Sequence, residues 1–321
     1  MTWWPDTYGK EHPQATTLAA YRSMAKEPVI LGLGATALAD LTPKHVADWQ
    51  AHMLQNPARR GRAPKAGAPE KPAPPLAAKR VLNARVMLHA ALEEAVRMGM
   101  LPSNPVARIR APKVTTKRVD SFSREQVGAL MAKAEGHALA PMIATAWQTG
   151  LRLGELCGIR WADVDLDAGT ARVARTAAST GAPVFMQEPK SLSPRSPCPG
   201  ATVALLRAHG KRQAEDRLRL GPAWQDNDLV FATSRGTALH AGRVEGVFND
   251  FRNAARLPCH SFHAPRHMYA SLALLAGVPL ETASGNLGHG GISFTKRVYA
   301  HVLPEAKRAG ADLMGAVVGR V

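Results

Sequence analysis

The last fifth of the 321-residue chain gathers residue types that could break a bond beside a bound anion. His263 and Arg266 stand three apart, so on a helix both would project from one face. His289 lies between Leu-Gly and Gly-Gly, which predicts a turn beside a helix, and Tyr299 follows ten residues later. An arginine can hold the anion, imidazoles can move protons, and a phenol can act as the nucleophile.

Two further candidates stand earlier in the chain, and each also has a plainer interpretation. Arg152 lies in T-G-L-R-L-G-E-L, three residues before Glu155, a spacing that also fits a buried structural Arg–Glu pair. Lys190 follows a predicted β-hairpin, where an isolated lysine is typical of the surface. Taken alone, His263 fits a core histidine, as His267 and His301 do, and Tyr299 fits the core or its rim.

Metal and nucleotide chemistry fit the sequence poorly. Cys259, His260 and His263 would be half of a zinc site, but no second cysteine pair completes it. The Gly32-Leu-Gly34 segment is not followed by the β-α-β unit that dinucleotide binding needs. Four carboxylates could suggest magnesium, but the last three of them fall in the turn before the hairpin and should be solvated: Glu155, Asp163, Asp165 and Asp167. We therefore predict no metal, nucleotide or redox cofactor.

The charge balance predicts a polyanionic partner. The chain has a formal net charge of +16 and a pI of about 10.3, with +9 in residues 1–120 and +7 in residues 121–321. Because both halves are basic, nucleic acid is favoured over a membrane surface. No apolar run is long enough to span a bilayer, and the first residues do not form a signal peptide. The three scattered cysteines suit a reducing cytoplasm.

The elements that must position these residues fall into two predicted domains. Residues 1–112 read as a small helical domain, with a helix from Thr42-Pro43 onward and a long amphipathic helix over 79–100. The apolar positions of the long helix are Val81, Val86, Leu88, Leu92 and Val96. A Pro- and Ala-rich segment over 56–78 reads as a mobile loop whose cations could follow a phosphate backbone: Arg59, Arg60, Arg62 and Lys65.

Residues 113–120 form a basic linker, and a second domain covers 121–321. Ser123 and Gln126 predict a capping box at its start, and a helix should break at Thr149-Gly150. The strand pattern over 170–187 predicts one short hairpin around Ser179-Thr-Gly181. Most of 201–220 and 240–321 should be helical, so we expect a mainly α fold with a small antiparallel β-sheet.

The order of the motifs adds information that the single residues lack. Five elements in this order resemble the catalytic domain of tyrosine recombinases, the phage integrase family. They are T-G-L-R-x-G-E-L, a lysine after the hairpin, H-x-x-R, L-G-H and a tyrosine ten residues on. The resemblance covers about 121–305, and segments of residues 1–112 resemble the family's core-site DNA-binding domain. Two positions depart from the family pattern. H-D-L-R-H is H-A-P-R-H here, which predicts a missing support near Arg266, and T-K-T is P-K-S, which leaves Lys190 well placed.

The resemblance implies a site-specific recombinase that forms a 3′-phosphotyrosyl intermediate and a Holliday junction. Arg152 and Arg266 would hold the scissile phosphate and Tyr299 would attack it. Lys190 would protonate the leaving oxygen, His263 would accept a proton, His289 would bind the phosphate, and Glu155 would orient Arg152. The implied partners are a double-stranded attachment site, three further copies in a tetramer, and an accessory directionality factor, in the nucleoid of the cytoplasm.

The resemblance leaves three other functions open. A Xer-like chromosome-dimer resolvase shares the same chemistry, and the basic loop over 56–78 favours a minimal phage or mobile-element integrase over it. We expect no separate arm-binding domain before the helical one. A type IB topoisomerase-like relaxase would use the same tyrosine without pairing two sites. A DNA-binding regulator without catalysis is disfavoured by the intact set of catalytic residue types.

Overall fold

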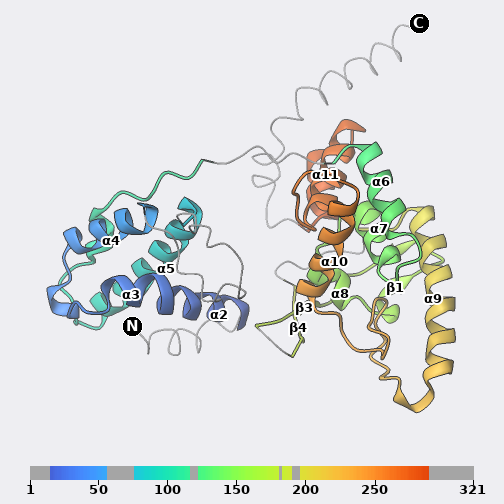
Figure 1. The fold of residues 1–321 in the computed structure, drawn as a ribbon, viewed down its shortest axis with the longest axis horizontal. Coiled ribbons are helices and arrows are strands. Elements are labelled where there is room, and N and C mark those ends of the chain that lie inside the picture. The colour runs from blue at the N-terminus through green and yellow to red at the C-terminus, as the bar shows by residue number, and fades with distance from the viewer. Residues whose placement is uncertain (1–14, 56–75, 116–121, 181–182, 190–195, 289–321) are drawn as a thin grey trace, which may run out of the picture. The chain divides into compact units, whose positions relative to one another are not determined.

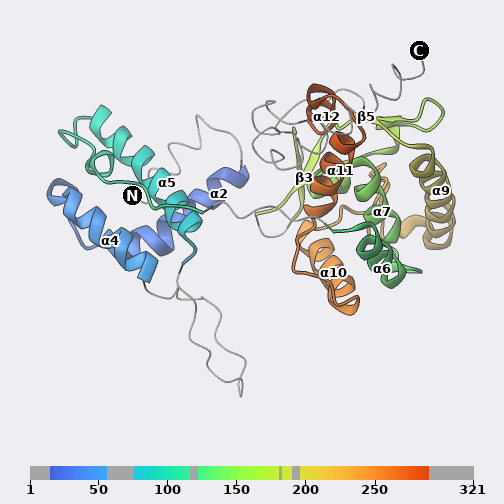
Figure 2. The same ribbon diagram turned by 90° about the horizontal axis from the view of Figure 1, so that it is seen from above.

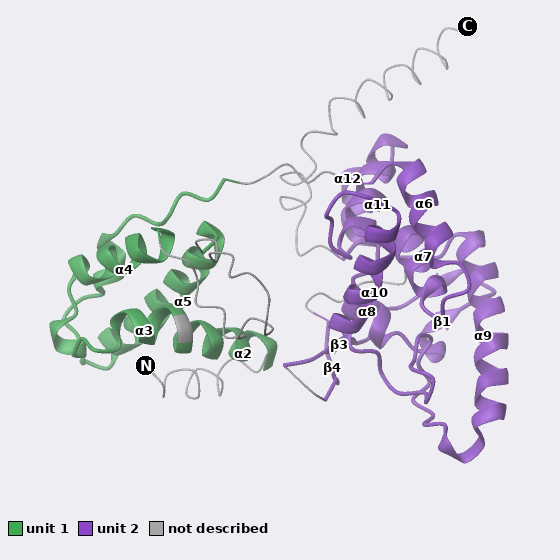
Figure 3. Ribbon diagram, viewed as in Figure 1, with its two compact units in different colours: residues 1–117 green, residues 118–321 purple. Residues whose placement is uncertain are grey.

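The computed structural model describes residues 15–55, 76–115, 122–180, 183–189 and 196–288, which form helices and short antiparallel strands (Figure 1). The chain divides into two compact units, Met1–Lys117 and Arg118–Val321 (Figure 3). Each unit has its own hydrophobic core. The mainly α fold with small antiparallel sheets that the sequence predicts is confirmed. The four cations predicted in the basic loop lie outside the described residues: Arg59, Arg60, Arg62 and Lys65.

The described elements of the first unit are all helical. They are α2 (Ala15–Met24), the π-helix η1 (Ala25–Val29), α3 (Ile30–Leu33), the 3-10 helix η2 (Leu38–Asp40), α4 (Pro43–Gln55), α5 (Ala78–Arg97) and the 3-10 helix η3 (Pro105–Arg108). Pro28 lies inside the π-helix, where it has no N–H for the regular helical bond. The indole Nε1 of Trp49 donates to the Pro28 carbonyl at 2.6 Å, which ties α4 to this irregular turn.

The long helix α5 occupies the predicted position, but its buried face differs from the predicted one. Val81, Leu88 and Leu92 are buried as expected. Val86 is 52% exposed, so its place in the apolar stripe was predicted wrongly. Small side chains complete the buried face instead, including Ala84 and the other alanines at positions 91 and 95. Alanine is a strong helix former, but its small side chain is a weak signal of hydrophobic periodicity. The prediction therefore counted the more apolar Val86 in the buried face and overlooked the alanines.

The second unit holds the remaining helices and all the described strands. Its helices are α6 (Arg124–Ala134), α7 (Ala140–Thr149), α8 (Leu153–Gly158), η4 (Trp161–Asp163), α9 (Gly200–Leu220), η5 (Gly221–Ala223), α10 (Ala241–Ala254), α11 (Ala264–Leu275) and α12 (Leu280–Asn286). The predicted capping box is present: Gln126 N donates to Ser123 Oγ at 3.3 Å, and Ser123 N donates to Gln126 Oε1 at 2.9 Å.

The strand pattern over 170–187 belongs to two sheets, which corrects the prediction that these residues form a single hairpin. One sheet has the order β1 (Val164–Asp165), β2 (Thr170–Ala171), β5 (Ser196–Pro197), and the other pairs β3 (Thr176–Ala178) with β4 (Phe185–Gln187); all pairs are antiparallel. Only β3 and β4 form the expected hairpin. Strands of two or three residues are too short to show the alternation from which strands are recognised.

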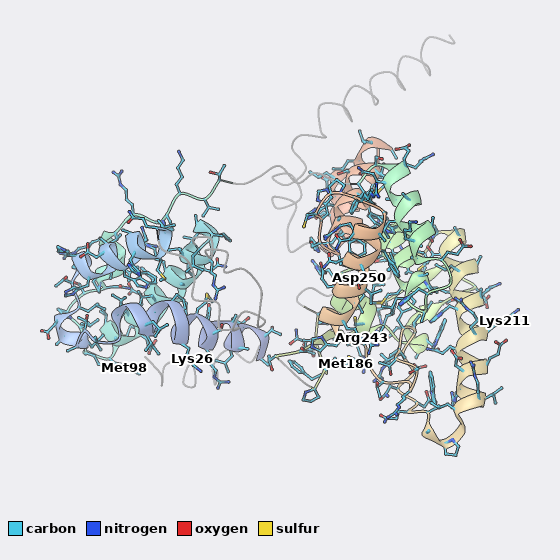
Figure 4. The ribbon with its side chains drawn as sticks, in the orientation of Figure 1. Lys26, Met98, Met186, Lys211, Arg243 and Asp250 are labelled. Carbon is cyan, nitrogen blue, oxygen red and sulfur yellow. The ribbon has the colours of Figure 1, made fainter. Side chains whose placement is uncertain are left out.

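Two helices far apart in the sequence build the centre of this unit. Helices α7 and α11 pack against each other and lie side by side in both views (Figures 1 and 2). Helix α9 is peripheral, since only Thr202 and Leu206 of its side chains are buried, and Lys211 projects from it away from the rest of the unit (Figure 4). The packing of α7 on α11 brings the two arginine motifs of the sequence together.

Candidate active site

Gly150 ends α7 and directs the chain into the first arginine motif. Its φ of +67° is left-handed, a conformation that glycine adopts without strain. A Cβ at this position would lie 2.8 Å from Leu287 Cδ2 and 3.0 Å from Tyr269 Cδ1. Both the backbone and the available space therefore require glycine here, and the segment around Leu287 packs directly on this turn.

Arg152 is held by a carboxylate at the start of α8. Its Nη1 donates to Glu155 Oε1 at 2.6 Å, and its backbone N donates to Glu155 Oε2 at 2.8 Å. Glu155 is buried, at 5% exposure, whereas the Arg152 side chain is 34% exposed. One carboxylate thus fixes both the helix start and the arginine, while part of the guanidinium group faces solvent. The Arg152 Nη2 donates to the Gly288 carbonyl at 2.9 Å.

Arg266 lies in the first turn of α11 and is 2% exposed. Its Nη1 donates to the Gly150 carbonyl at 3.0 Å, and its Nη2 donates to the Leu287 carbonyl. A guanidinium group has five N–H donors in a rigid fork, so it can join two backbone segments at once. Arg266 therefore links the end of α7 to the end of α12.

The two arginines converge on neighbouring peptide units. Leu287 and Gly288 are consecutive, and their Cα atoms are about 3.8 Å apart in a trans peptide. The carbonyl of Leu287 accepts from Arg266, and that of Gly288 accepts from Arg152. Both guanidinium groups therefore lie beside the segment that leads directly into His289. The first and second arginine motifs, separated by more than one hundred positions, meet at the third motif.

His263 stands at the N-terminus of α11, beside these cations. Burial and, after it, the positive charges of His267, Arg266 and Arg152 together lower its pKa from 6.5 to about 4. The residue is exposed to solvent, and on the protein side its neighbours are the His267 ring and the two arginines. At neutral pH the imidazole is therefore uncharged and able to accept a proton. An anion bound between the two arginines would oppose their charge and raise this pKa.

The hairpin is fixed to the helix that follows Arg152. A Cβ on Gly154 would lie 2.6 Å from Thr176 Oγ1, and one on Gly158 would lie 2.9 Å from Ala177 N. The two glycines of α8 thus allow β3 to lie directly against the helix. Beyond the hairpin, Ser196 Oγ donates to the Asn286 carbonyl at 3.2 Å. Strand β3 therefore lies on α8, and Ser196 of β5 lies beside the end of α12.

The structure brings four of the predicted site residues together: Arg152, Glu155, His263 and Arg266. Three others lie outside the described residues: Lys190, His289 and Tyr299. Sequence reasoning missed the carbonyls of Gly150, Leu287 and Gly288 as partners of the arginines. Gly150, just before Arg152, and Gly288, just before His289, both have positive φ, which glycine adopts without strain.

The support expected to be missing near Arg266 has a partial substitute. Ala264 occupies the position of the family's aspartate and has no carboxylate to offer. The backbone N of Phe262, two residues earlier, donates to Glu245 Oε1 at 3.0 Å. Glu245 belongs to α10, far enough upstream that motif spacing could not reveal it. A carboxylate from another helix therefore anchors the segment that leads into His263.

Two further observations concern only the described residues. Among them, no group of three or more His, Cys, Asp and Glu side chains is placed to hold a metal ion. Nor does this part of the chain contain a helix with the length and apolar character needed to cross a bilayer.

Known proteins resemble this chain in sequence. The phage integrase family matches residues 120–306. A tyrosine recombinase XerC-like protein of Caldanaerobacter subterraneus subsp. tengcongensis is 33% identical over 235 residues, which cover 66% of this chain and 60% of the relative. The chain thus aligns with less than two thirds of that protein's length. An integrase of Streptomyces ambofaciens is 25% identical over 326 residues, covering 98% of this chain and 78% of the relative.

Solved structures share the fold. The Tn1549 transposon integrase in complex with transposon right end DNA has a TM-score of 0.74 at 18% identity, covering 98% of this chain and 100% of the other. A lambda integrase tetramer bound to a Holliday junction has a TM-score of 0.62 at 22% identity, with 92% and 76% covered. The family match spans more than half of the chain and contains both arginine motifs. The chain therefore belongs to the phage integrase family of tyrosine recombinases.

Proposed function

We propose that this protein is a site-specific DNA integrase that cuts and rejoins strands through a 3′-phosphotyrosyl intermediate and a Holliday junction. One observation carries the proposal: Arg152 and Arg266 converge on the consecutive carbonyls of Leu287 and Gly288, directly before His289. Two guanidinium forks at one place can bind the non-bridging oxygens of a single phosphate and stabilise the charge of its transition state.

In this mechanism the remaining residues move protons and form the covalent bond. The Tyr299 oxygen attacks phosphorus, and its proton passes to His263, which is neutral at pH 7. The bond from phosphorus to the 5′-oxygen breaks, and Lys190 protonates that leaving oxygen. His289 donates a hydrogen bond to the phosphate. Glu155 keeps Arg152 in position and does not touch the DNA. These roles need no metal or organic cofactor.

The proposed partners follow from charge and from the relatives. Both halves of the chain are basic, which suits contacts with the phosphate backbone of a double-stranded attachment site. The helical unit, with the cations at 59, 60, 62 and 65, would bind the core site, so that both units surround the duplex. The lambda integrase tetramer bound to a Holliday junction supports a tetramer as the assembly that exchanges strands. A directionality factor would complete the assembly. The protein would act at the nucleoid, in the cytoplasm.

Recombination of paired sites tests the proposal. The purified protein is incubated with two labelled duplexes that carry the junctions between a mobile element and its host. Exchanged products and a Holliday junction intermediate are the expected result. Relaxation of supercoiled DNA of any sequence without exchange would show a topoisomerase-like relaxase instead. DNA binding without any strand cleavage would show a regulator.

A Xer-like chromosome-dimer resolvase is the second candidate, because a 33% identical relative has a XerC-like name. The same assay separates the two functions. A resolvase would recombine a chromosomal site with an identical copy of itself. An integrase would instead join two different sites, one from the element and one from the host.

A further inference from the structure

His267 contacts the proposed proton acceptor one helical turn along α11. The His263 and His267 rings are 4.8 Å apart between centroids, with an interplanar angle of 84°. This is an edge-to-face contact, the arrangement that aromatic rings prefer. The two residues are four apart, so the helix itself sets them on one face, and the backbone N of His267 donates to the His263 carbonyl at 3.3 Å.

Among the residues that the structure describes, few other groups orient the His263 ring. It is the N-cap residue of α11, yet its side chain makes no capping bond there. Its backbone N donates to Ser261 Oγ at 3.3 Å, which fixes the chain and leaves the imidazole to other contacts. The ring of His267 is half-buried and contacts the His263 ring, so it can hold the His263 imidazole in one orientation, which solvent cannot do.

In the described part of the chain, the charged groups around this pair come mainly from the arginine motifs. Helix α7, packed against α11, brings no ionisable side chain, and α12 brings Glu281, which is exposed. The positive charges acting on His263 come from Arg266, from Arg152 and from His267 itself. Arg266 also acts on His267. Because each imidazole opposes protonation of the other, the pair takes up its protons in two separate steps.

We propose that His267 is a positioning residue, which holds the His263 imidazole by ring-to-ring contact in the orientation that meets the scissile phosphate. This inference rests on the proposed function, because His263 needs an orientation only if it takes part in strand cleavage. It assigns no direct contact with DNA to His267. Where the pH is low enough for His267 to be protonated, its charge also opposes protonation of His263.

Two variants separate ring contact from charge. His267→Phe keeps an aromatic ring beside His263 but cannot be protonated, and His267→Ala removes the ring. The rate of covalent adduct formation is measured on a nicked substrate from pH 4 to pH 9, together with the melting temperature and the DNA affinity of each variant.

The expected results differ between the variants. In His267→Phe the plateau rate stays near that of the unsubstituted protein, but the acidic limb of the profile moves to higher pH, because His263 loses a neighbouring positive charge. In His267→Ala the plateau also falls, by up to about 100-fold, as expected for a catalytic group misplaced by about 1 Å. DNA affinity stays unchanged in both. A purely structural role would instead lower the melting temperature and leave the acidic limb in place, which would overturn the proposal.

A second measurement does not depend on cleavage. The His263 ring is titrated by NMR in the DNA-free protein, with and without His267→Phe. A rise in the His263 pKa in the variant supports the contact and its charge effect, and an unchanged pKa contradicts them. Absence of any adduct from the unsubstituted protein would contradict the proposed function. An adduct with both an unchanged acidic limb and an unchanged His263 pKa would contradict this inference alone.

Discussion

Arg266 Nη1 donates to the Gly150 carbonyl at 3.0 Å, which joins the first turn of α11 to the end of α7. The same side chain also donates to Leu287, just after α12. A residue that the sequence marks only as a phosphate ligand is therefore also part of the core. Binding of the anion and cohesion of the unit depend on one guanidinium group, so substitutions here should affect both.

Arg266→Lys should lower stability as well as cleavage. An ammonium group is a point charge that cannot replace a fork that joins two carbonyls. Loss of one hydrogen bond to a charged group costs roughly 1.5–3 kcal/mol. We therefore expect a clear fall in melting temperature together with the loss of strand cleavage. Arg243→Lys, at an exposed position of α10, is the control and should leave the melting temperature unchanged. A stable but inactive Arg266→Lys protein would show that the carbonyl contacts contribute little.

Gly150→Ala tests whether the turn before Arg152 needs glycine. The positive φ and the contacts with Leu287 and Tyr269 should together cost about 2 kcal/mol or more. Gly128 provides a matched control, because it lies exposed in α6 with no atom within 4 Å of the position of a Cβ. Gly128→Ala should stabilise the helix by up to about 1 kcal/mol. Urea unfolding measures the free energy of unfolding of both variants. Equal changes in Gly150→Ala and Gly128→Ala would refute the special role of Gly150.

Arg152→Lys should separate catalysis from stability. Its guanidinium group is partly exposed, so its loss should change the melting temperature less than Arg266→Lys does. Cleavage should fall by about 100- to 1,000-fold, the usual effect of removing a preorganised donor from a transition state. Single-turnover cleavage of a nicked duplex measures this effect. Near-normal cleavage would place the phosphate clamp elsewhere.

Glu155→Gln should reduce cleavage through Arg152. The amide oxygen can still accept a hydrogen bond, but the negative charge that holds the guanidinium group is lost. We expect about a tenfold loss of cleavage, with DNA affinity nearly unchanged. Arg152→Lys combined with Glu155→Gln should then be no worse than Arg152→Lys alone. Additive losses in this double-mutant cycle would mean that Glu155 acts independently of Arg152.

The lowered pKa of His263 predicts how stability changes with pH. In the unfolded chain the imidazole binds a proton near its ordinary pKa of 6.5, whereas in the folded protein it does so near pH 4. As the pH falls from 7 towards 4, the unfolded state takes up protons first, so the free energy of unfolding decreases. His263→Gln should make this decrease smaller.

Melting temperatures at pH 7.5 and pH 5 measure that difference. Some of the decrease should remain in His263→Gln, because burial and the charge of Arg266 also lower the pKa of His267. His52→Gln, an exposed histidine in the first unit, is the control. The interpretation fails if His263→Gln loses as much stability at pH 5 as the unsubstituted protein does.

The sequence predicted the elements whose signals are local. The capping box at Ser123 and the helix break at Gly150 depend on a few adjacent residues, and both are present as predicted. The division of 170–187 between two sheets was missed, because β2 pairs with β5, whose residues lie beyond the hairpin. Strand pairing of this kind depends on distant partners that no local pattern contains.

The candidate site was predicted as a set of residue types rather than as a geometry. The order of motifs placed Arg152 and Arg266 at one phosphate, and the structure places both beside Leu287 and Gly288. The backbone carbonyls and Glu245 could not be predicted, because a backbone contact leaves no mark on residue identity. The roles of Lys190, His289 and Tyr299 stay predictions.

The most direct test of this account is to map the covalent bond. The protein and its Tyr299→Phe variant are incubated with a nicked duplex that traps the intermediate, and the adduct is digested and sequenced by mass spectrometry. The account predicts a DNA 3′-phosphate on Tyr299 of the unsubstituted protein, and a variant that binds DNA but forms no adduct. An adduct on another residue, or one that persists in Tyr299→Phe, would contradict it.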